Sequence, residues 1–210
     1  MVRRTKEEAQ ATRNRILDTA EMVFQEHGVS RTSLQDIAAA AGVTRGAIYW
    51  HFRDKAELFN AMMERVVLPL ESQAHSRDAQ ASDDALAAIR DNFTFALRRA
   101  ADDPQARRVF EIATHKVEYV DELRAVRDRR LASRNGCLAH GEGALKRAVR
   151  RGELSLALPA RSAALGLHAL IDGLIQNWML DPEAFDLVKV GRQVLEAYLN
   201  GIAPVGRERA

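Results

Sequence analysis

The sequence predicts an all-α protein of about nine helices, and two observations lead to that fold class. Apolar residues recur at spacings of three and four, as in Ile16, Ala20 and Val23 of the first segment. No run of alternating apolar and polar residues bounded by turn residues occurs in the sequence, so strands are not expected. With 47% hydrophobic residues, the 210-residue chain can bury one sizeable core, or a small domain attached to a larger one.

Glycine and proline mark several of the expected helix ends. Gly28 and Gly152 follow periodic segments, as residues just beyond the last turn of a helix usually do. The Asp-Pro pairs at 103–104 and 181–182 are typical of an N-cap residue followed by proline in the first helical turn. These signals predict helices that begin at 104 and 182 and helices that end near 28 and 152.

Composition limits the class of protein. The single cysteine excludes an internal disulfide, the N-terminus carries no export signal, and the most apolar segment, 165–180, is interrupted by polar side chains. We therefore expect a soluble, cytoplasmic protein. The net charge of +2 is too small for a nucleic-acid-binding surface that covers the whole chain, so any basic surface must be local.

Residues 32–58 carry the most specific local pattern. Thr32 and Gln35 have capping-box spacing at the start of a short helix, and Gly42 then permits a sharp turn. Thr44 is suited to cap a second short helix over 45–49, with Ile48 pointing inward. Two short helices around a glycine turn predict a helix-turn-helix motif.

Two further features of this N-terminal region favour an anionic partner. Asp54 and Glu57 repeat the capping-box spacing and place Lys55 in the first turn of a third helix, where the helix dipole favours a phosphate. The first fifteen residues hold five basic and two acidic side chains, with Arg3 and Arg4 at the start of this arm.

The segment from Gly28 to Leu58, above all GVTRGAIYWHFRDKAEL, resembles the DNA-binding part of tetracycline-repressor-type (TetR family) regulators. RRTKEEAQATRNRILDTAE at the start, ARRVFEIATHK from Ala106 and DGLIQNW from Asp172 resemble the AcrR-like branch, the repressors of multidrug efflux pumps. The resemblance implies a DNA-binding domain over 1–56 and a helical ligand-binding and dimerisation domain over 57–210. It also implies a homodimeric repressor that leaves a pseudo-palindromic operator when a small hydrophobic ligand binds, such as an antibiotic, a dye or a plant phenolic.

By this resemblance the second short helix is the recognition helix. Arg45 is expected to contact guanine, and Gly46 and Ala47 are small enough to approach a thymine methyl group. Phosphate contacts are expected from Thr32, Ser33, Tyr49, His51 and Lys55, and Thr44 is also expected to belong to the DNA-binding residues. Trp50 and Phe52 are expected to pack in the core.

The last two long helices, near 160–180 and 185–202, have apolar residues on more than one face. More apolar surface than one core needs indicates a partner, and in the resembled family these helices form a four-helix bundle across the dimer. The residues expected at this dimer interface are Leu167, Leu174, Trp178, Val194 and Tyr198.

A ligand pocket is expected where sparse polar groups lie among apolar helix faces. The expected lining residues are Ile89, Asn92, Phe93, Ala96, Phe110, Thr114, Cys137, His168, Asp172 and Gln176. Cys137 is expected to act as a small apolar core residue. The alternative for Asp172 is a buried carboxylate that pairs with a neighbouring helix.

Glycine and proline residues fall inside two of the helices that the resemblance implies, and both residue types disfavour a continuous helix. Gly136, Gly141 and Gly143 fall where the family has one long helix, and each costs a helix about 1 kcal/mol relative to alanine. Pro69 removes one backbone hydrogen bond, so a kink or an end is expected there.

An enzyme is the competing class of function. The sequence contains no HExxH zinc motif, Walker loop, GxGxxG turn or GxSxG elbow, so no enzyme and no cofactor is expected. The pairs Glu71/His75, Glu111/His115 and His168/Asp172 have a spacing of four that permits a metal ion but is common by chance. A metal-sensing or metabolite-sensing regulator of the same fold remains the alternative, and a helical-bundle metalloenzyme is a weaker one.

Overall fold

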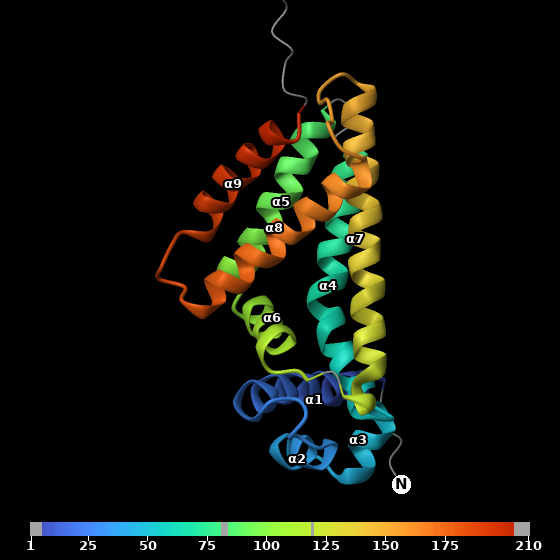
Figure 1. The fold of residues 1–210 in the computed structure, drawn as a ribbon. Coiled ribbons are helices and arrows are strands. Elements are labelled where there is room, and N and C mark those ends of the chain that lie inside the picture. The colour runs from blue at the N-terminus through green and yellow to red at the C-terminus, as the bar shows by residue number, and fades with distance from the viewer. Residues whose placement is uncertain (1–5, 81–83, 119, 204–210) are drawn as a thin grey trace, which may run out of the picture. The chain divides into compact units, whose positions relative to one another are not determined.

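The computed structural model describes residues 6–80, 84–118 and 120–203, although side chains are not described over most of 70–80. This part of the chain contains helices and no strands, as expected. The elements, labelled in Figure 1, are α1 (Lys6–His27), α2 (Leu34–Ala40), α3 (Arg45–His51), α4 (Lys55–Gln80), α5 (Ala85–Asp102), α6 (Pro104–His115), the 3-10 turn η1 (Asp121–Leu123), α7 (Arg124–Arg150), α8 (Ala160–Leu180) and α9 (Leu187–Gly201). None of these helices is both long enough and apolar enough to span a membrane.

The chain divides into two compact units. The first contains residues 1–67 and 108–131, and the second contains residues 68–107 and 132–210. Three helices, α4, α6 and α7, therefore begin in one unit and end in the other.

The core of the first unit forms between α1, α2, α3 and the start of α4. Phe24 of α1 is completely buried, and its ring centroid lies 6.1 Å from that of Phe59 on α4. Ile37 of α2 and Ile48 of α3 are also completely buried. Each short helix is thus held in place by large apolar side chains in a shared core, with Leu34 buried beside Ile37 on α2.

Residues 108–131 complete this first unit. The backbone N–H of Val29, just after α1, donates to the carbonyl of Lys116 at 2.9 Å. Gln25 donates to the carboxylate of Glu111 at 2.8 Å, so α1 is also joined to α6. The sequence pattern gives no sign that this distant segment packs with the helix-turn-helix.

The second unit is built on α5, α8 and α9, which pack against one another (Figure 1). Leu97 of α5 and Leu195 of α9 are buried at this junction, and Gly191 lets α9 approach Leu97 closely. Arg90 of α5 holds Glu196 of α9 with two hydrogen bonds of 2.6 and 2.9 Å.

Two of the expected glycine ends are confirmed, and so is one Asp-Pro start. Gly28 and Gly152 have positive φ angles of 82° and 74°, which terminate α1 and α7. Asp103 caps α6, since its carboxylate accepts from the backbone N–H groups of Gln105 and Ala106.

The other Asp-Pro prediction is wrong. Asp181 accepts from the N–H of Glu183 in a local turn, and α9 begins at Leu187, where the Asp186 carboxylate accepts from the N–H of Lys189. An aspartate followed by proline also suits a turn, which is what this pair forms.

The expected interruption of α7 is wrong. Helix α7 is continuous through its three glycines, because Ala144, Leu145 and Ala148 bury its next turns in the second unit. Helix α4 continues past Pro69, so the expected end there is wrong, while the expected kink stays a prediction. Tertiary packing outweighs a propensity cost of about 1 kcal/mol for each glycine.

Candidate functional site

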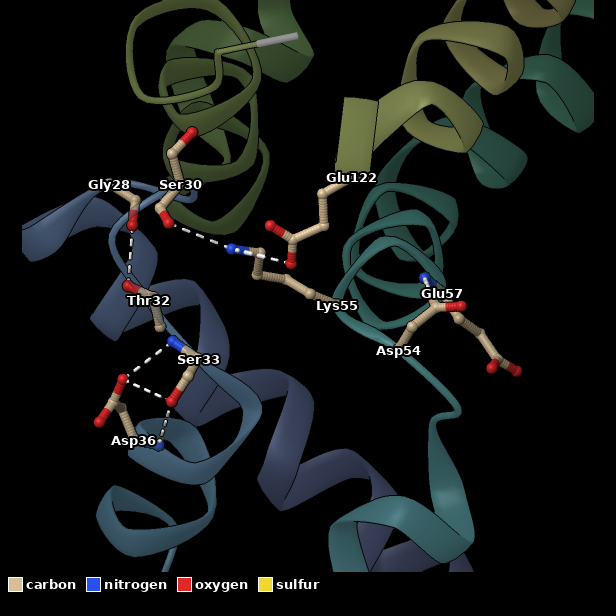
Figure 2. A network of polar contacts seen from close by, with 9 residues as sticks. All are labelled: Gly28, Ser30, Thr32, Ser33, Asp36, Asp54, Lys55, Glu57 and Glu122. Carbon is tan, nitrogen blue, oxygen red and sulfur yellow. Dashed lines mark hydrogen bonds and ion pairs between the residues drawn. The ribbon is translucent and has the colours of Figure 1, made fainter. Parts of the chain in front are cut away.

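Helix α2 begins one residue later than the capping-box pattern predicted (Figure 2). The Ser33 hydroxyl accepts from the backbone N–H of Asp36 at 3.2 Å, and the Asp36 carboxylate accepts from the Ser33 N–H at 2.8 Å. The hydrogen bond from the Ser33 hydroxyl lowers the pKa of Asp36. Thr32 is buried and donates to the carbonyl of Gly28 at 2.7 Å, so the expected box of Thr32 and Gln35 is wrong.

Helix α3 has the arrangement expected of a recognition helix. The Thr44 hydroxyl accepts from the N–H of Ala47 at 3.1 Å, which confirms the predicted cap, and the Gly42 turn has a φ of +61°. Ile48 points into the core, as expected. Arg45 and Tyr49 are exposed, and the guanidinium carbon of Arg45 lies 5.7 Å from the centroid of the Tyr49 ring.

The two aromatic residues after Tyr49 differ from each other in burial. Phe52 is buried, as predicted, with the Arg13 guanidinium carbon 5.1 Å from its ring centroid. Trp50 is 72% exposed, so the prediction of core packing is wrong for this residue. Because Trp50 follows the inward-pointing Ile48 by two residues, it lies about 200° round the helix from it, whereas Phe52 follows by four and shares its face. That spacing was the signal that could have identified Trp50 as exposed.

Lys55 does not present its ammonium group to solvent. Its side chain is only 6% exposed, and Nζ donates to the carbonyl of Ser30 at 3.2 Å and lies 3.4 Å from a carboxylate oxygen of Glu122 (Figure 2). The expected phosphate contact would require this ammonium to leave both partners. In the structure, Lys55 joins parts of the first unit to one another.

The start of α4 is capped by acidic side chains (Figure 2). Asp54 accepts from the N–H of Glu57 at 2.8 Å, as predicted. The Glu57 carboxylate accepts from the N–H of Arg53, one residue before the expected partner, at 2.8 Å. The first turn of this helix therefore already has an anionic partner within the protein.

The remaining predicted DNA contacts are distributed unevenly. Ser33, Thr44 and Gly46 are exposed, Ala47 and His51 are half-buried, and the His51 ring lies edge-on to Trp50 with centroids 4.5 Å apart. Arg3 and Arg4 lie outside the described residues. The exposed members of the predicted set thus lie on or next to α3 and at the N-terminal end of α2.

The residues predicted to line a ligand pocket fall in both units. Phe110 and Thr114 belong to the first unit, and the others belong to the second. On α5, Ile89 and Phe93 are buried and Asn92 and Ala96 are half-buried.

The polar pocket residues on α8 are partly accessible. His168, Asp172 and Gln176 are half-buried, and the His168 Nε2 lies 3.4 Å from a carboxylate oxygen of Asp172. The alternative of a buried Asp172 paired with another helix is wrong, since its side chain is 48% exposed and its partner is on the same helix. Cys137 is exposed, so its predicted burial in the core is also wrong.

The pairs considered as metal ligands do not form larger groups. Within the described ranges, no three histidine, cysteine or acidic side chains meet in a geometry that could hold a metal ion. Glu111 accepts a hydrogen bond from Gln25, and the side chains of Glu71 and His75 are not among those described.

An apolar hollow lies between α8 and α9, with a volume of about 400 Å³. Leu174 and Val194, both predicted at the dimer interface, are among the residues that line it, together with Ala169, Leu170, Gly173, Asn177, Phe185 and Val190. The half-buried Tyr198 donates to the carbonyl of Ala163 at 2.9 Å, and burial raises the pKa of its hydroxyl.

Two of the residues predicted at the dimer interface have other surroundings. Leu167 and Trp178 are buried within the second unit. The Arg107 guanidinium carbon lies 4.6 Å from the centroid of the Trp178 ring. Neither residue has the accessible surface that a partner needs, so both predictions are wrong.

The helix-turn-helix geometry agrees with the comparison to known protein families. Residues 16–62 match the bacterial regulatory proteins of the tetR family, and residues 84–203 match the C-terminal region of MAATS-type transcriptional repressors. The chain belongs to the TetR family. TetR regulators bind operator DNA, and this protein is accordingly a transcriptional regulator rather than an enzyme.

Three relatives illustrate how far the similarity extends. The transcriptional regulator TtgR of Pseudomonas putida is 42% identical over 188 residues, which cover 90% of each chain. The crystal structure of NalD, the secondary repressor of the MexAB-OprM multidrug efflux pump in Pseudomonas aeruginosa, is 38% identical, with a TM-score of 0.86 over 96% of this chain and 100% of NalD. SmeT, the repressor of the Stenotrophomonas maltophilia multidrug efflux pump SmeDEF, is 34% identical in its complex with triclosan, with a TM-score of 0.83 over 94% of each chain.

Proposed function

We propose that this protein represses an operon for a multidrug efflux pump and leaves its operator when a small hydrophobic compound binds the second unit. The observation that carries this proposal is full-length similarity to NalD and SmeT, each of which represses such a pump. A protein that binds operator DNA in this way acts in the bacterial cytoplasm.

Operator recognition is assigned to the exposed face of α3. Arg45 is suited to a bidentate contact with guanine, which contributes roughly 1 to 3 kcal/mol of discrimination between bases. Tyr49 lies against Arg45 and can limit the rotamers of the free arginine side chain. Trp50, exposed on the same short helix, adds apolar surface beside these groups.

Dimerisation is assigned to the apolar hollow of α8 and α9. Its lining is almost entirely apolar, with Asn177 as the one polar side chain in it. A dimer would place two copies of α3 on the two halves of a pseudo-palindromic operator.

The inducer is assigned to the second unit as a small hydrophobic compound. SmeT binds triclosan, and the half-buried His168, Asp172 and Gln176 provide the sparse polar groups that orient an apolar ligand. The ligand must bind the conformation that cannot bind DNA more tightly than the one that can. Equal affinity for both conformations would leave their equilibrium unchanged.

The test is a footprint of the purified protein on the DNA upstream of its own gene. We expect a protected pseudo-palindrome, and we expect the protection to fade as triclosan, hydrophobic antibiotics, dyes or plant phenolics are titrated. Protection that is unaffected by any of these compounds, but is lost when zinc or iron is added, would identify a metal sensor in place of the proposed drug sensor.

A further inference from the structure

We propose that Arg107 is a positioning residue for ligand-dependent release of the operator, because its guanidinium fastens the start of α6 to helices α5 and α8. This inference rests on the proposed function, in which a compound bound in the second unit causes that release. It assigns part of the link between the two events to one side chain, which the sequence pattern does not single out.

The Arg107 guanidinium contacts two other helices at once. Its Nε donates to the carbonyl of Ala100 at 3.5 Å, and its Nη2 donates to the carbonyl of Ala101. Both carbonyls belong to the last turn of α5, where backbone oxygens lack partners within the helix and the helix dipole favours a cation. The guanidinium carbon lies 4.6 Å from the centroid of the Trp178 ring on α8, close enough for a cation–π contact.

The surroundings of this guanidinium favour a fixed position. Ala100 is completely buried and Trp178 is only 6% exposed, so the half-buried Arg107 lies at the edge of a packed core. Asp103 fixes the turn between α5 and α6, since its carboxylate caps α6 and lies 2.7 Å from Nη1 of Arg99. The first turn of α6 is therefore held to α5 and α8.

The other end of α6 is bonded to the segment that leads into the helix-turn-helix. Glu111, one turn after Arg107, accepts from Gln25 of α1 at 2.8 Å, and the carbonyl of Lys116, directly after the helix, accepts from the N–H of Val29. Val29 lies in the connection from α1 to α2 and is completely buried. One continuous helix of 12 residues thus has its first turn bonded within the second unit and its last turns bonded within the first.

Loss of the guanidinium should change the coupling between ligand and operator more than either affinity alone. The contacts of Arg107 lie in the second unit, whereas the side chains assigned to operator recognition lie in the first. Helices α4 and α7 also begin in one unit and end in the other, so the loss of coupling should be partial. Substitutions between two coupled sites typically change the coupling factor about 2- to 30-fold.

Arg107→Gln removes the charge and the cation–π contact, and Arg108→Gln is its matched control. Arg108 is the next residue of the same helix and is also half-buried, and its side chain forms no hydrogen bond or ion pair with any residue that the structure describes. Both changes remove one positive charge from α6, so a general effect of charge on DNA binding is common to them. Arg107→Lys is milder, because it keeps the charge but loses the planar group that stacks on the indole.

The experiment measures operator binding by the full-length protein with and without saturating triclosan, by fluorescence anisotropy. The coupling factor is the ratio of the two operator dissociation constants. We expect this factor to match the wild type in Arg108→Gln, to fall about 2- to 30-fold toward a limit of 1 in Arg107→Gln, and to fall less in Arg107→Lys. Equal factors in Arg107→Gln and Arg108→Gln would overturn the inference.

A stability measurement separates this role from a structural one. A side chain that only stabilises the fold would lower the free energy of unfolding and leave the coupling factor unchanged, which would also overturn the inference. If Arg107→Gln does not fold, Arg107→Lys is compared with Arg108→Lys, and we expect the factor to fall only in Arg107→Lys.

A second readout requires no DNA. Triclosan should change the hydrogen exchange of the Val29 amide, which is bonded to Lys116, in the wild type and in Arg108→Gln, and should change it less in Arg107→Gln. An equal response in the two variants would overturn the inference while leaving operator release by the wild-type protein intact. A wild-type protein that triclosan does not release from its operator would instead refute the proposed response to this compound, and the role of Arg107 with it.

Discussion

The helix-turn-helix pair α2–α3 and the long helices α8 and α9 are stabilised in different ways. Helices α2 and α3 have only seven residues each, and their starts are fixed by backbone N–H groups that donate to the hydroxyls of Ser33 and Thr44. Helices α8 and α9 have 21 and 15 residues and leave an apolar hollow of about 400 Å³ between them. The first region buries Ile37 and Ile48 in a shared core and exposes Trp50 on one short helix, whereas the second leaves an apolar hollow accessible between two long helices.

This difference reflects what each region must recognise. A DNA-binding domain has to hold a few side chains in one geometry. Short helices with defined ends and a well-packed core can provide that geometry. A sensor that dimerises and binds apolar compounds needs accessible apolar surface and can rely on long packed helices for its stability.

Removing a core side chain of the first unit should have the largest effect. Phe24→Ala deletes a completely buried ring that packs against Phe59, and such a change costs about 3 to 5 kcal/mol. Chemical denaturation measures the loss. Met22→Ala, an exposed position on the same helix, should change the free energy of unfolding by less than about 0.5 kcal/mol. Similar losses in the two variants would show that the core of this unit is not closed.

Two glycines of the second unit should respond to alanine in opposite directions. A Cβ at Gly166 would overlap the Tyr198 hydroxyl, so Tyr198 must move and give up its bond to Ala163. We expect a loss of about 1 to 3 kcal/mol. Gly136 on α7 has open space, so Gly136→Ala should gain about 0.5 to 1 kcal/mol. Thermal unfolding of both variants provides the check, and a gain in Gly166→Ala would contradict the packing of α8 on α9.

Arg45→Ala should reduce sequence discrimination rather than stability. We expect the difference in binding free energy between operator and random DNA to shrink by roughly 1 to 3 kcal/mol. The free energy of unfolding should stay within about 0.5 kcal/mol of wild type. Arg53→Ala is the matched control, because Arg53 is also exposed near α3 but pairs with Asp54. If Arg45→Ala discriminates between operator and random DNA as well as the wild type does, Arg45 does not read bases.

Loss of the α2 cap should be smaller. Ser33→Ala removes the hydroxyl that accepts from Asp36 and should cost about 1 kcal/mol. Gln35→Ala, which alters the exposed second member of the misassigned capping box, should be neutral within about 0.5 kcal/mol. Urea titrations compare the free energies of unfolding of the two variants. A larger loss of stability in Gln35→Ala would favour the capping box of Thr32 and Gln35.

The weakest expected effect depends on pH. Hydrogen bonds from Arg90 lower the pKa of Glu196, so the folded state binds this proton less readily than the unfolded chain. The stabilisation is present above the ordinary glutamate pKa of about 4.3 and is lost as the pH falls through the lower folded value. The stability difference between wild type and Glu196→Gln should therefore shrink between pH 7 and pH 3. A constant difference would show that the ion pair contributes nothing.

The sequence predicted the parts of the fold that depend on local chemistry. Gly42, Thr44 and Ile48 define α3 because turn geometry, capping and periodicity are properties of neighbouring residues. The sequence could not decide whether Thr32 or Ser33 caps α2, since both have the hydroxyl that a cap requires. The continuity of α7 through Gly136 was missed because distant packing, which the local pattern does not contain, outweighs propensity.

The candidate site was harder to predict where it depends on tertiary contacts. Lys55 has the composition and position of a phosphate ligand, and only the folded chain brings Glu122 and Ser30 to its ammonium. Leu167 and Trp178 have the periodicity of an interface, yet they are buried within their own unit. Periodicity identifies an apolar face but does not say whether the chain itself or a partner covers it.

The central claim is that ligand binding and operator binding are coupled between the two units. Calorimetry of triclosan binding to the free protein and to its operator complex tests this most directly. We expect operator to weaken triclosan binding about 5- to 150-fold, by the same factor with which triclosan weakens operator binding, because the coupling free energy is reciprocal. Triclosan that binds the free protein and the operator complex with equal affinity would contradict the coupling.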